Sequence, residues 1–155
     1  MLGVAFVALA GVLLVLDRVT KAWAARTLLL GDPHPLIGNA IRLTRVHNTG
    51  GAFGVLAGNP FIFVIVSFVI AIAVLVAFIL LRGRRPVLRL ALVLVFVGAV
   101  GNLVDRLSVG YVVDFFEIVG FPVFNVADSC VTVGAILIVL YALVGGRRPS
   151  TSPEN

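Results

Sequence analysis

Four long apolar runs, separated by short polar stretches, dominate the chain. A helix that crosses a membrane needs about 20 mostly apolar residues. The runs at 60–81 and 129–145 carry no charge, and the run at 87–104 carries only Arg89, close to its start. The first run begins at the N-terminus and is extended in a helical pattern by "DRVTKAWAARTLLL". The pattern therefore predicts four spanning helices, at about 2–26, 60–81, 87–106 and 128–145.

The composition agrees with a membrane protein. Of the 155 residues, 61% are hydrophobic, and the mean hydropathy is +1.17. A soluble domain of this size cannot bury so much apolar surface, so the expected solvent is a bilayer. We expect one all-α integral membrane domain over 1–146, with an outer β and loop segment at about 27–59. The polar tail at 147–155 is expected to be disordered and cytoplasmic.

The first apolar run could also be a cleaved signal peptide. Such peptides carry positive charge before the apolar stretch. Here no Lys or Arg precedes the run, and Asp17, Arg18 and Lys21 follow it within the helical pattern. This arrangement favours an uncleaved first helix.

Basic residues predict the orientation of the helices. They gather in the link between the second and third helices and again after the fourth, at Arg82, Arg84, Arg85, Arg89, Arg147 and Arg148. Cytoplasmic loops carry such an excess of Lys and Arg. Both termini are then cytoplasmic, and the segments at about 27–59 and 107–127 face outward. The net charge of +5 is thereby explained by topology, without nucleic acid as a partner.

Under this orientation, the polar residues of several helices lie near the outer face. Asp17 and Lys21 are four residues apart and can form an ion pair on one helix face, and Asn102 and Arg106 have the same spacing. Ionisable groups at membrane depth usually face a bundle interior or a cavity. The alternative is that they are ordinary interfacial caps, which accounts less well for polar residues in four separate segments.

The first outer segment contains two local signals. Alternation around Ile41, Leu43 and Val46 predicts a small pair of strands. The stretch "HNTGGAFGVLAG" then supplies four glycines, which permit tight turns or close approach to a ligand. Asn59 and Pro60 are suited to begin the second helix, with Asn as its cap.

Two aspartates lie in apolar surroundings before the last helix. Asp114 occurs in "YVVDFFEI", where burial should raise its pKa. Asp128 follows Asn125, which is expected to cap the helix, so its carboxylate lies in the first turn. If the two carboxyl groups meet, they share one proton and can activate water on a peptide carbonyl. Their spacing alone is equally compatible with caps or surface residues.

The remaining candidate residues suggest no second chemistry. Glu117 is expected to face water, and the single cysteine, Cys130, to be a packed thiol. His34 and His47 are the only histidines, and no Cys/His cluster has zinc spacing. We therefore expect neither a metal site nor a cofactor.

Five stretches, taken in order, carry a family resemblance. They are "DRVTKAW", "NTGGAF", "GAVGNLVDRL", "GYVVDFFEI" and "FPVFNVADS". With these stretches the chain resembles lipoprotein signal peptidase, also called signal peptidase II. One departure is Gly51, which stands where the family more often has a small alanine-like residue.

The resemblance implies an aspartic endopeptidase of the bacterial inner membrane, with its active site at the outer face. It implies four transmembrane helices, a small extracytoplasmic β cradle and an amphipathic segment between the first two helices. Its substrates would be prolipoproteins carrying diacylglycerol on the lipobox cysteine, cut on the N-terminal side of that cysteine. Membrane lipids are the other expected partners of a monomer, and globomycin is a family inhibitor.

The resemblance also assigns site residues by motif position. The catalytic dyad corresponds to Asp114 and Asp128. Residues that bind substrate or support the site correspond to Asn48, Gly50, Asn102, Arg106, Asn125 and Ala127, and structural positions to Asp17, Lys21 and Gly98.

Two alternative functions are less favoured by the sequence. A small transporter or channel would spread polar residues through the bilayer depth, often with broken helices. The second and fourth apolar runs are instead unbroken and uncharged. A presenilin-like protease would carry a Gly-x-Gly-Asp motif, which this sequence does not contain.

Overall fold

Four long helices and a small sheet make up the computed structural model, which describes residues 2–51, 59–81 and 85–145. The helices are α1 (Leu2–Thr27), α2 (Pro60–Leu80), α3 (Pro86–Val109) and α4 (Val126–Gly145). Each is long and apolar enough to cross a membrane. The predicted four-helix membrane fold is therefore confirmed for the described part of the chain.

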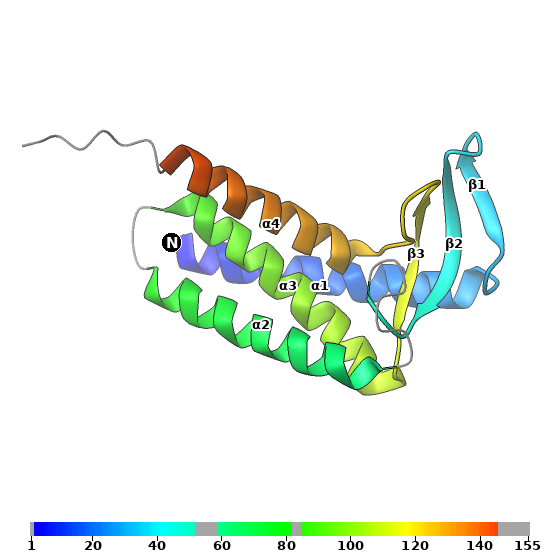
Figure 1. Cartoon of the computed structure of the whole chain (residues 1–155), viewed down its shortest axis with the longest axis horizontal. Coiled ribbons are helices and arrows are strands. Elements are labelled where there is room, and N and C mark those ends of the chain that lie inside the picture. The colour runs from blue at the N-terminus through cyan, green and yellow to red at the C-terminus, as the bar shows by residue number, and fades with distance from the viewer. Residues whose placement is uncertain (1, 52–58, 82–84, 146–155) are drawn as a thin grey trace, which may run out of the picture.

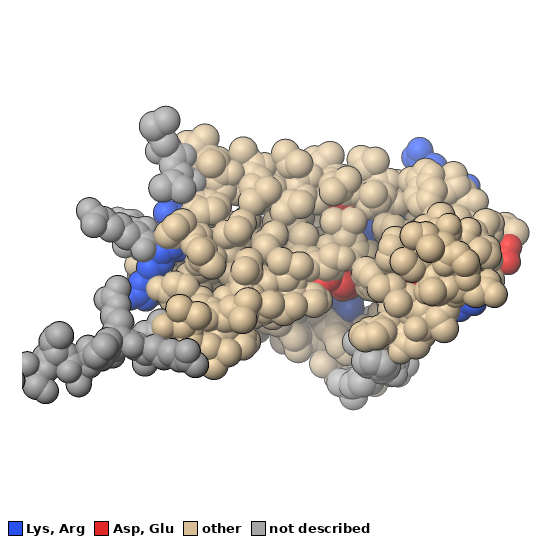
Figure 2. Space-filling view, turned by 90° about the horizontal axis from the view of Figure 1, so that it is seen from above, with Lys and Arg blue, Asp and Glu red and all other residues tan. Residues whose placement is uncertain are grey.

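The bundle has two distinct ends. Figure 1 shows the start of α1, the end of α2, the start of α3 and the end of α4 together at one end. The sheet lies at the opposite end. Figure 2 shows a patch of basic side chains at the helical end and others around the sheet. Arg85 and Arg89 lie at the start of α3, which belongs to the helical end. The predicted basic positions 82, 84, 147 and 148, and the predicted disordered tail, lie outside the described residues.

Helix α3 is the central element. Half of its most apolar stretch is buried, against 11% for α1 and α2 and 17% for α4. It packs against α1, α2 and α4. Small residues allow the closest approach: a Cβ on Gly98 would lie 2.3 Å from the Ala127 carbonyl oxygen, and one on Gly134 would lie 2.8 Å from that of Ala91. Close helix packing of this kind is typical of membrane bundles.

The helix ends follow local chemistry. Pro occupies the first turn of α2 and α3, where its missing N–H is not needed. Asn59 occupies the predicted N-cap position of α2, but its side chain makes no capping hydrogen bond. Helix α3 continues past the expected end at 106 and stops at Gly110, whose φ of 83° is left-handed. Glycine reaches that conformation without steric cost.

Three antiparallel strands form the sheet, in the order β1-β2-β3. Strands β1 (Pro33–Ile37) and β2 (Ile41–Asn48) belong to the first outer segment, where a strand pair was predicted. Strand β3 (Val112–Ile118) comes from the link between α3 and α4. The sequence did not predict β3 as a partner in this sheet. The described part of the first outer segment forms strands and turns, and residues 52–58 lie outside the described residues.

The sheet is fixed to the end of α1. Arg45 of β2 donates to the carbonyl oxygens of Ala25 (2.8 Å) and Leu28 (3.4 Å), which have no partners further along the helix. Leu28 also packs in one apolar cluster with Val113 and Phe115 of β3. This anchorage fixes β3, and with it Asp114, over the end of the bundle.

Candidate active site

Asp114 is almost completely buried on β3, with 1% of its surface exposed. Its Oδ2 accepts a hydrogen bond from Asn48 Nδ2 at 2.9 Å, and its Oδ1 accepts one from Asn125 Nδ2 at 2.6 Å. Burial, reinforced by the nearby charge of Asp128, raises the pKa of Asp114 from 3.8 to about 7. The two amide hydrogen bonds oppose this increase. A protonated Asp114 is therefore available near neutral pH.

Asp128 lies in the first turn of α4, where it is part of the helix cap. Its backbone N–H donates to Asn125 Oδ1 at 2.9 Å, and its Oδ2 accepts from the Asn125 backbone N–H at 3.1 Å. This reciprocal pair is a capping box, and it confirms the predicted cap role of Asn125. Asn102 Nδ2 donates to the other carboxylate oxygen at 2.7 Å. Both oxygens of Asp128 are thus held in a fixed direction.

Asn125 connects the two aspartates. Its side-chain Nδ2 donates to Asp114 and to Asn102 Oδ1, the latter at 3.2 Å. Its backbone N–H donates to the Asp128 carboxylate, and its side-chain oxygen accepts from the Asp128 backbone N–H. Only 1% of Asn125 is exposed. The structure therefore brings the two sequence-predicted aspartates to the same asparagine, one from the sheet and one from α4.

A neutral cluster of four charges lies beside these residues, between α1 and α3. Lys21 Nζ is 3.0 Å from Asp17 Oδ2 and 2.8 Å from Asp105 Oδ2. Arg18 contacts the same two carboxylates, at 2.7 and 2.5 Å. The predicted Asp17–Lys21 pair is confirmed. The sequence did not identify Arg18 and Asp105 as partners of Asp17 and Lys21. The available signal was that Asp105 lies in the third helix at about the same predicted depth in the membrane as Asp17 and Lys21.

The charge cluster supports the aspartate site through two hydrogen bonds. Lys21 Nζ donates to Asn102 Oδ1 at 2.9 Å, which orients the Asn102 amide toward Asp128. Asp17 Oδ1 accepts from the Ala127 backbone N–H at 3.0 Å. Asp17 and Ala127 are both fully buried. The cluster thereby fixes the first turn of α4 and the amide partner of Asp128.

Arg106 is oriented by groups outside its own helix. Its Nη2 donates to the Gly50 carbonyl at 2.9 Å, and its guanidinium carbon lies 5.1 Å from the ring centre of Phe63 on α2. The i,i+4 spacing of Asn102 and Arg106 also gives a contact, because Arg106 Nη1 donates to the Asn102 backbone carbonyl at 3.5 Å. The Asn48 side-chain oxygen accepts from the Gly50 N–H at 2.9 Å. Arg106 is thereby linked through Gly50 and Asn48 to Asp114.

Two other sequence candidates make no hydrogen bond to the paired aspartates in the described part of the chain. Glu117 was expected to be solvated, but it accepts hydrogen bonds from Arg42 and Thr44 of β2. The Arg42 guanidinium holds the pKa of Glu117 below its usual range. Glu117 is three residues from Asp114 along β3, so its side chain lies on the opposite face of the sheet. Cys130 is buried among Phe6, Val93 and Val97, as expected of a packed thiol.

An open groove leads to Asp128 along the exposed side of α4. Its volume is about 620 Å³. Apolar residues of the β3–α4 link and of α4 form most of its wall, and Asn48 and Asp128 supply polar atoms. In the described part of the chain, no group of three or more His, Cys, Asp or Glu side chains could hold a metal ion. The groove therefore gives access to Asp128 from a largely apolar surface, while Asp114 lies buried behind it.

Comparison with known proteins identifies the family. The model of the family "Signal peptidase (SPase) II" matches residues 9–144. The chain is 40% identical over 148 residues to the lipoprotein signal peptidase of Moorella thermoacetica, covering 96% of this chain and 99% of that one. It is 42% identical over 150 residues to that of Pelotomaculum thermopropionicum, covering 97% of each. A solved structure described as a bacterial membrane enzyme at 2.3 Å resolution matches with a TM-score of 0.90 and 33% identity, over 97% of this chain and 94% of that chain. The chain belongs to the signal peptidase II family, and it is a multi-pass membrane peptidase.

Proposed function

We propose that this peptidase removes the signal peptide from diacylglyceryl-modified prolipoproteins, cutting on the N-terminal side of the lipidated cysteine. The observation that carries the proposal is the meeting of Asp114 and Asp128 at Asn125. Two carboxyl groups with different surroundings supply one acid and one base, and peptide hydrolysis requires both.

The proposed reaction assigns a role to each aspartate. Asp114, with a pKa of about 7, is the protonated partner and donates to the carbonyl oxygen of the scissile peptide. Asp128 is the ionised partner and accepts a proton from the attacking water. Its charge is favoured at the start of α4 by the helix dipole. As the tetrahedral intermediate breaks down, Asp128 gives the proton that it took from water to the leaving nitrogen, and Asp114 recovers a proton from a hydroxyl of the intermediate.

The groove beside α4 fits the proposed substrate. A lipidated prolipoprotein stays in the membrane, so the protease must meet it at the bilayer surface. The apolar wall of the groove can contact the chain while the scissile peptide reaches Asp128. Arg106 is suited to bind a substrate carbonyl, because its guanidinium is already directed to a backbone oxygen, that of Gly50.

The proposed orientation places the aspartates at the outer face of the bacterial inner membrane, with both termini cytoplasmic. Arg85 and Arg89 lie at the helical end opposite the sheet, and basic residues favour the cytoplasmic side. All the residues of the proposed site belong to one chain, so a monomer is sufficient. The chemistry uses carboxyl groups and water, and we propose no cofactor.

A cleavage assay with purified protein tests the proposal. We expect Asp114→Asn and Asp128→Asn each to lower cleavage of a diacylglyceryl-modified prolipoprotein by about ten-thousandfold. Asp32→Asn is the matched control, because Asp32 is an exposed outer aspartate and should retain full activity. Near-normal turnover by either dyad variant would refute the assignment. Equal cleavage of the unmodified prolipoprotein would overturn the substrate class while leaving the dyad intact.

A further inference from the structure

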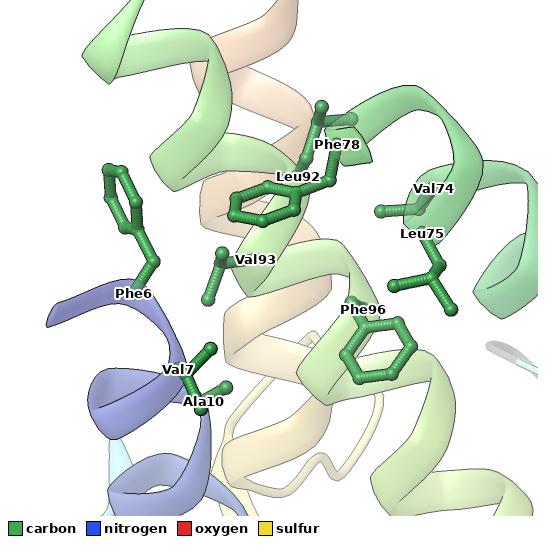
Figure 3. Close-up of a pocket in the computed structure, with 9 residues that line it drawn as sticks. All are labelled: Phe6, Val7, Ala10, Val74, Leu75, Phe78, Leu92, Val93 and Phe96. Carbon is green, nitrogen blue, oxygen red and sulfur yellow. The ribbon is translucent and has the colours of Figure 1, made fainter. Parts of the chain in front are cut away.

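An apolar cavity of about 170 Å³ lies between α1, α2 and α3, at the end of the bundle away from the sheet (Figure 3). Phe6, Val7 and Ala10 of α1 face α2 and α3 across it, and no polar side chain is among its lining residues. Val7 is 69% exposed and Leu75 of α2 is 40% exposed. The cavity therefore opens between α1 and α2 toward the membrane.

The crevice exists because of how the helices pack. Helix α2 packs on α3, while α1 packs on α3 and α4. Near the cavity, α1 and α2 meet through Phe6 and Phe78, whose rings are edge-to-face with centres 6.0 Å apart. An apolar void of this kind deprives its lining atoms of contacts. A cavity of about 150 Å³ with apolar walls holds a benzene-sized group, so this one has room for a short length of hydrocarbon chain.

Arg89 lies on these two rings at the inner end of the cavity. Its guanidinium carbon is 4.3 Å from the ring centre of Phe78 and 5.3 Å from that of Phe6. The cation–π contacts position the group without using its N–H donors. Its Nε is buried without a hydrogen-bond partner among the described residues. None of the ion pairs in the described ranges includes Arg89.

No acidic side chain in the described part of the chain is available to neutralise this end. The described acids are placed in the second half of α1, in the outer segments, at the end of α3 and at the start of α4: Asp17, Asp32, Asp105, Asp114, Glu117 and Asp128. Arg85 lies next to the start of α3, and the sequence adds two further arginines at 82 and 84. Among the described residues, the basic side chains at this end are therefore left without an acidic partner, which suits it to an external anion.

We infer that this crevice is a binding site for an anionic phospholipid of the inner leaflet. One acyl chain enters between α1 and α2 and fills the cavity, and the lipid phosphate accepts hydrogen bonds from Arg89. Anionic lipids of the cytoplasmic leaflet are attracted to basic residues next to a spanning helix. The lipid bridges α1 and α2 where the protein leaves a gap. This site is independent of the aspartates and of the proposed substrate groove.

Native mass spectrometry of the full-length protein tests the headgroup. The probe is an equal mixture of phosphatidylglycerol and phosphatidylcholine with identical acyl chains. We expect the wild type to retain phosphatidylglycerol preferentially, and Arg89→Gln to lower that preference about fivefold. Arg85→Gln, which removes an exposed charge at the start of the same helix, should change it much less. Arg89→Lys keeps the charge and should keep most of the preference.

Blocking the cavity tests the acyl chain. Ala10→Leu places a larger side chain in the cavity and should abolish retention of the tightly held lipid, whichever headgroup it carries. Ala8→Leu, on the exposed face of the same helix, should leave retention unchanged. Thermal unfolding of each variant reports whether it has folded. An unchanged lipid preference in Arg89→Gln, an equal loss in Arg85→Gln, or full retention in Ala10→Leu would each overturn the inference.

Discussion

The buried carboxyl of Asp114 allows a quantitative prediction about stability. Its pKa is about 7 in the folded protein, against an ordinary value of 3.8. A tenfold change in proton affinity is worth about 1.4 kcal/mol. Ionising Asp114 in the folded state therefore costs roughly 4 kcal/mol more than in the unfolded chain. Asp114→Asn removes this cost, because asparagine does not ionise.

The sign of the effect follows from where the protons are bound. Between about pH 4 and pH 7 the unfolded chain releases this proton while the folded protein keeps it, so the wild type loses stability as the pH rises. The stability of Asp114→Asn relative to wild type should increase across that interval, by up to roughly 4 kcal/mol. Asparagine also loses one of two accepted hydrogen bonds, those from Asn48 and Asn125. That loss costs about 1–3 kcal/mol. It lowers the stability of Asp114→Asn by the same amount at every pH, so the dependence of the stability difference on pH is unchanged.

Thermal unfolding in detergent micelles at a series of pH values measures this difference. Glu117→Gln is the matched control with the opposite sign. Arg42 lowers the pKa of Glu117, so its stabilising contribution is present at neutral pH and disappears on acidification. Glu117→Gln should therefore destabilise most at neutral pH. A difference between Asp114→Asn and wild type that does not vary with pH would refute the reasoning.

Three further variants test individual contacts. Asn48→Ala removes a hydrogen bond that lowers the pKa of Asp114, so the alkaline limb of the cleavage rate should move to higher pH. Phe63→Leu removes the ring under the Arg106 guanidinium and should lower kcat/KM about two- to fivefold, measured at low substrate. Gly98→Ala brings a Cβ to 2.3 Å from a backbone oxygen of α4, and should lower the free energy of unfolding by about 1–3 kcal/mol.

Controls for these variants are available on the same or neighbouring elements. Phe61→Leu changes an exposed ring near the start of α2 and should leave kcat/KM unaltered. Gly11→Ala adds a methyl group where nothing lies within 4 Å, so the free energy of unfolding should not fall. An alkaline limb that does not move in Asn48→Ala would contradict the described contact with Asp114. Equal changes of kcat/KM in the two Phe variants, or of the free energy of unfolding in the two Gly variants, would contradict the other contacts.

The sequence predicted the elements whose signals are local. The four helices follow from uninterrupted apolar runs, and the cap at Asn125 follows from residue type and position before the last run. The pair Asp17–Lys21 was predictable because four residues correspond to about one helical turn. Each of these signals requires only neighbouring residues, and the structure contains the corresponding feature.

What the sequence did not predict depends on contacts between distant segments. Strand β3 lacks clean alternation because Val112, Val113 and Asp114 are all buried, so it gives no half-buried strand pattern. Arg18 and Asp105 are 87 residues apart, and no spacing rule joins them. Arg106 contacts its helix neighbour Asn102 through the backbone carbonyl, but its contacts with a loop carbonyl and with a ring on α2 come from distant segments and were not predicted.

The charge cluster between α1 and α3 has a consequence for biogenesis. During synthesis α1 leaves the ribosome with Asp17, Arg18 and Lys21, whereas its neutralising partner Asp105 follows only after α2 and most of α3. An unpaired positive charge is costly within a bilayer. The second half of α1 is therefore expected to stay at the translocon or the membrane surface until α3 arrives. Release into lipid then depends on the same ion pairs that later fix the start of α4, so a chain that fails to pair them is retained before it can become an active protease.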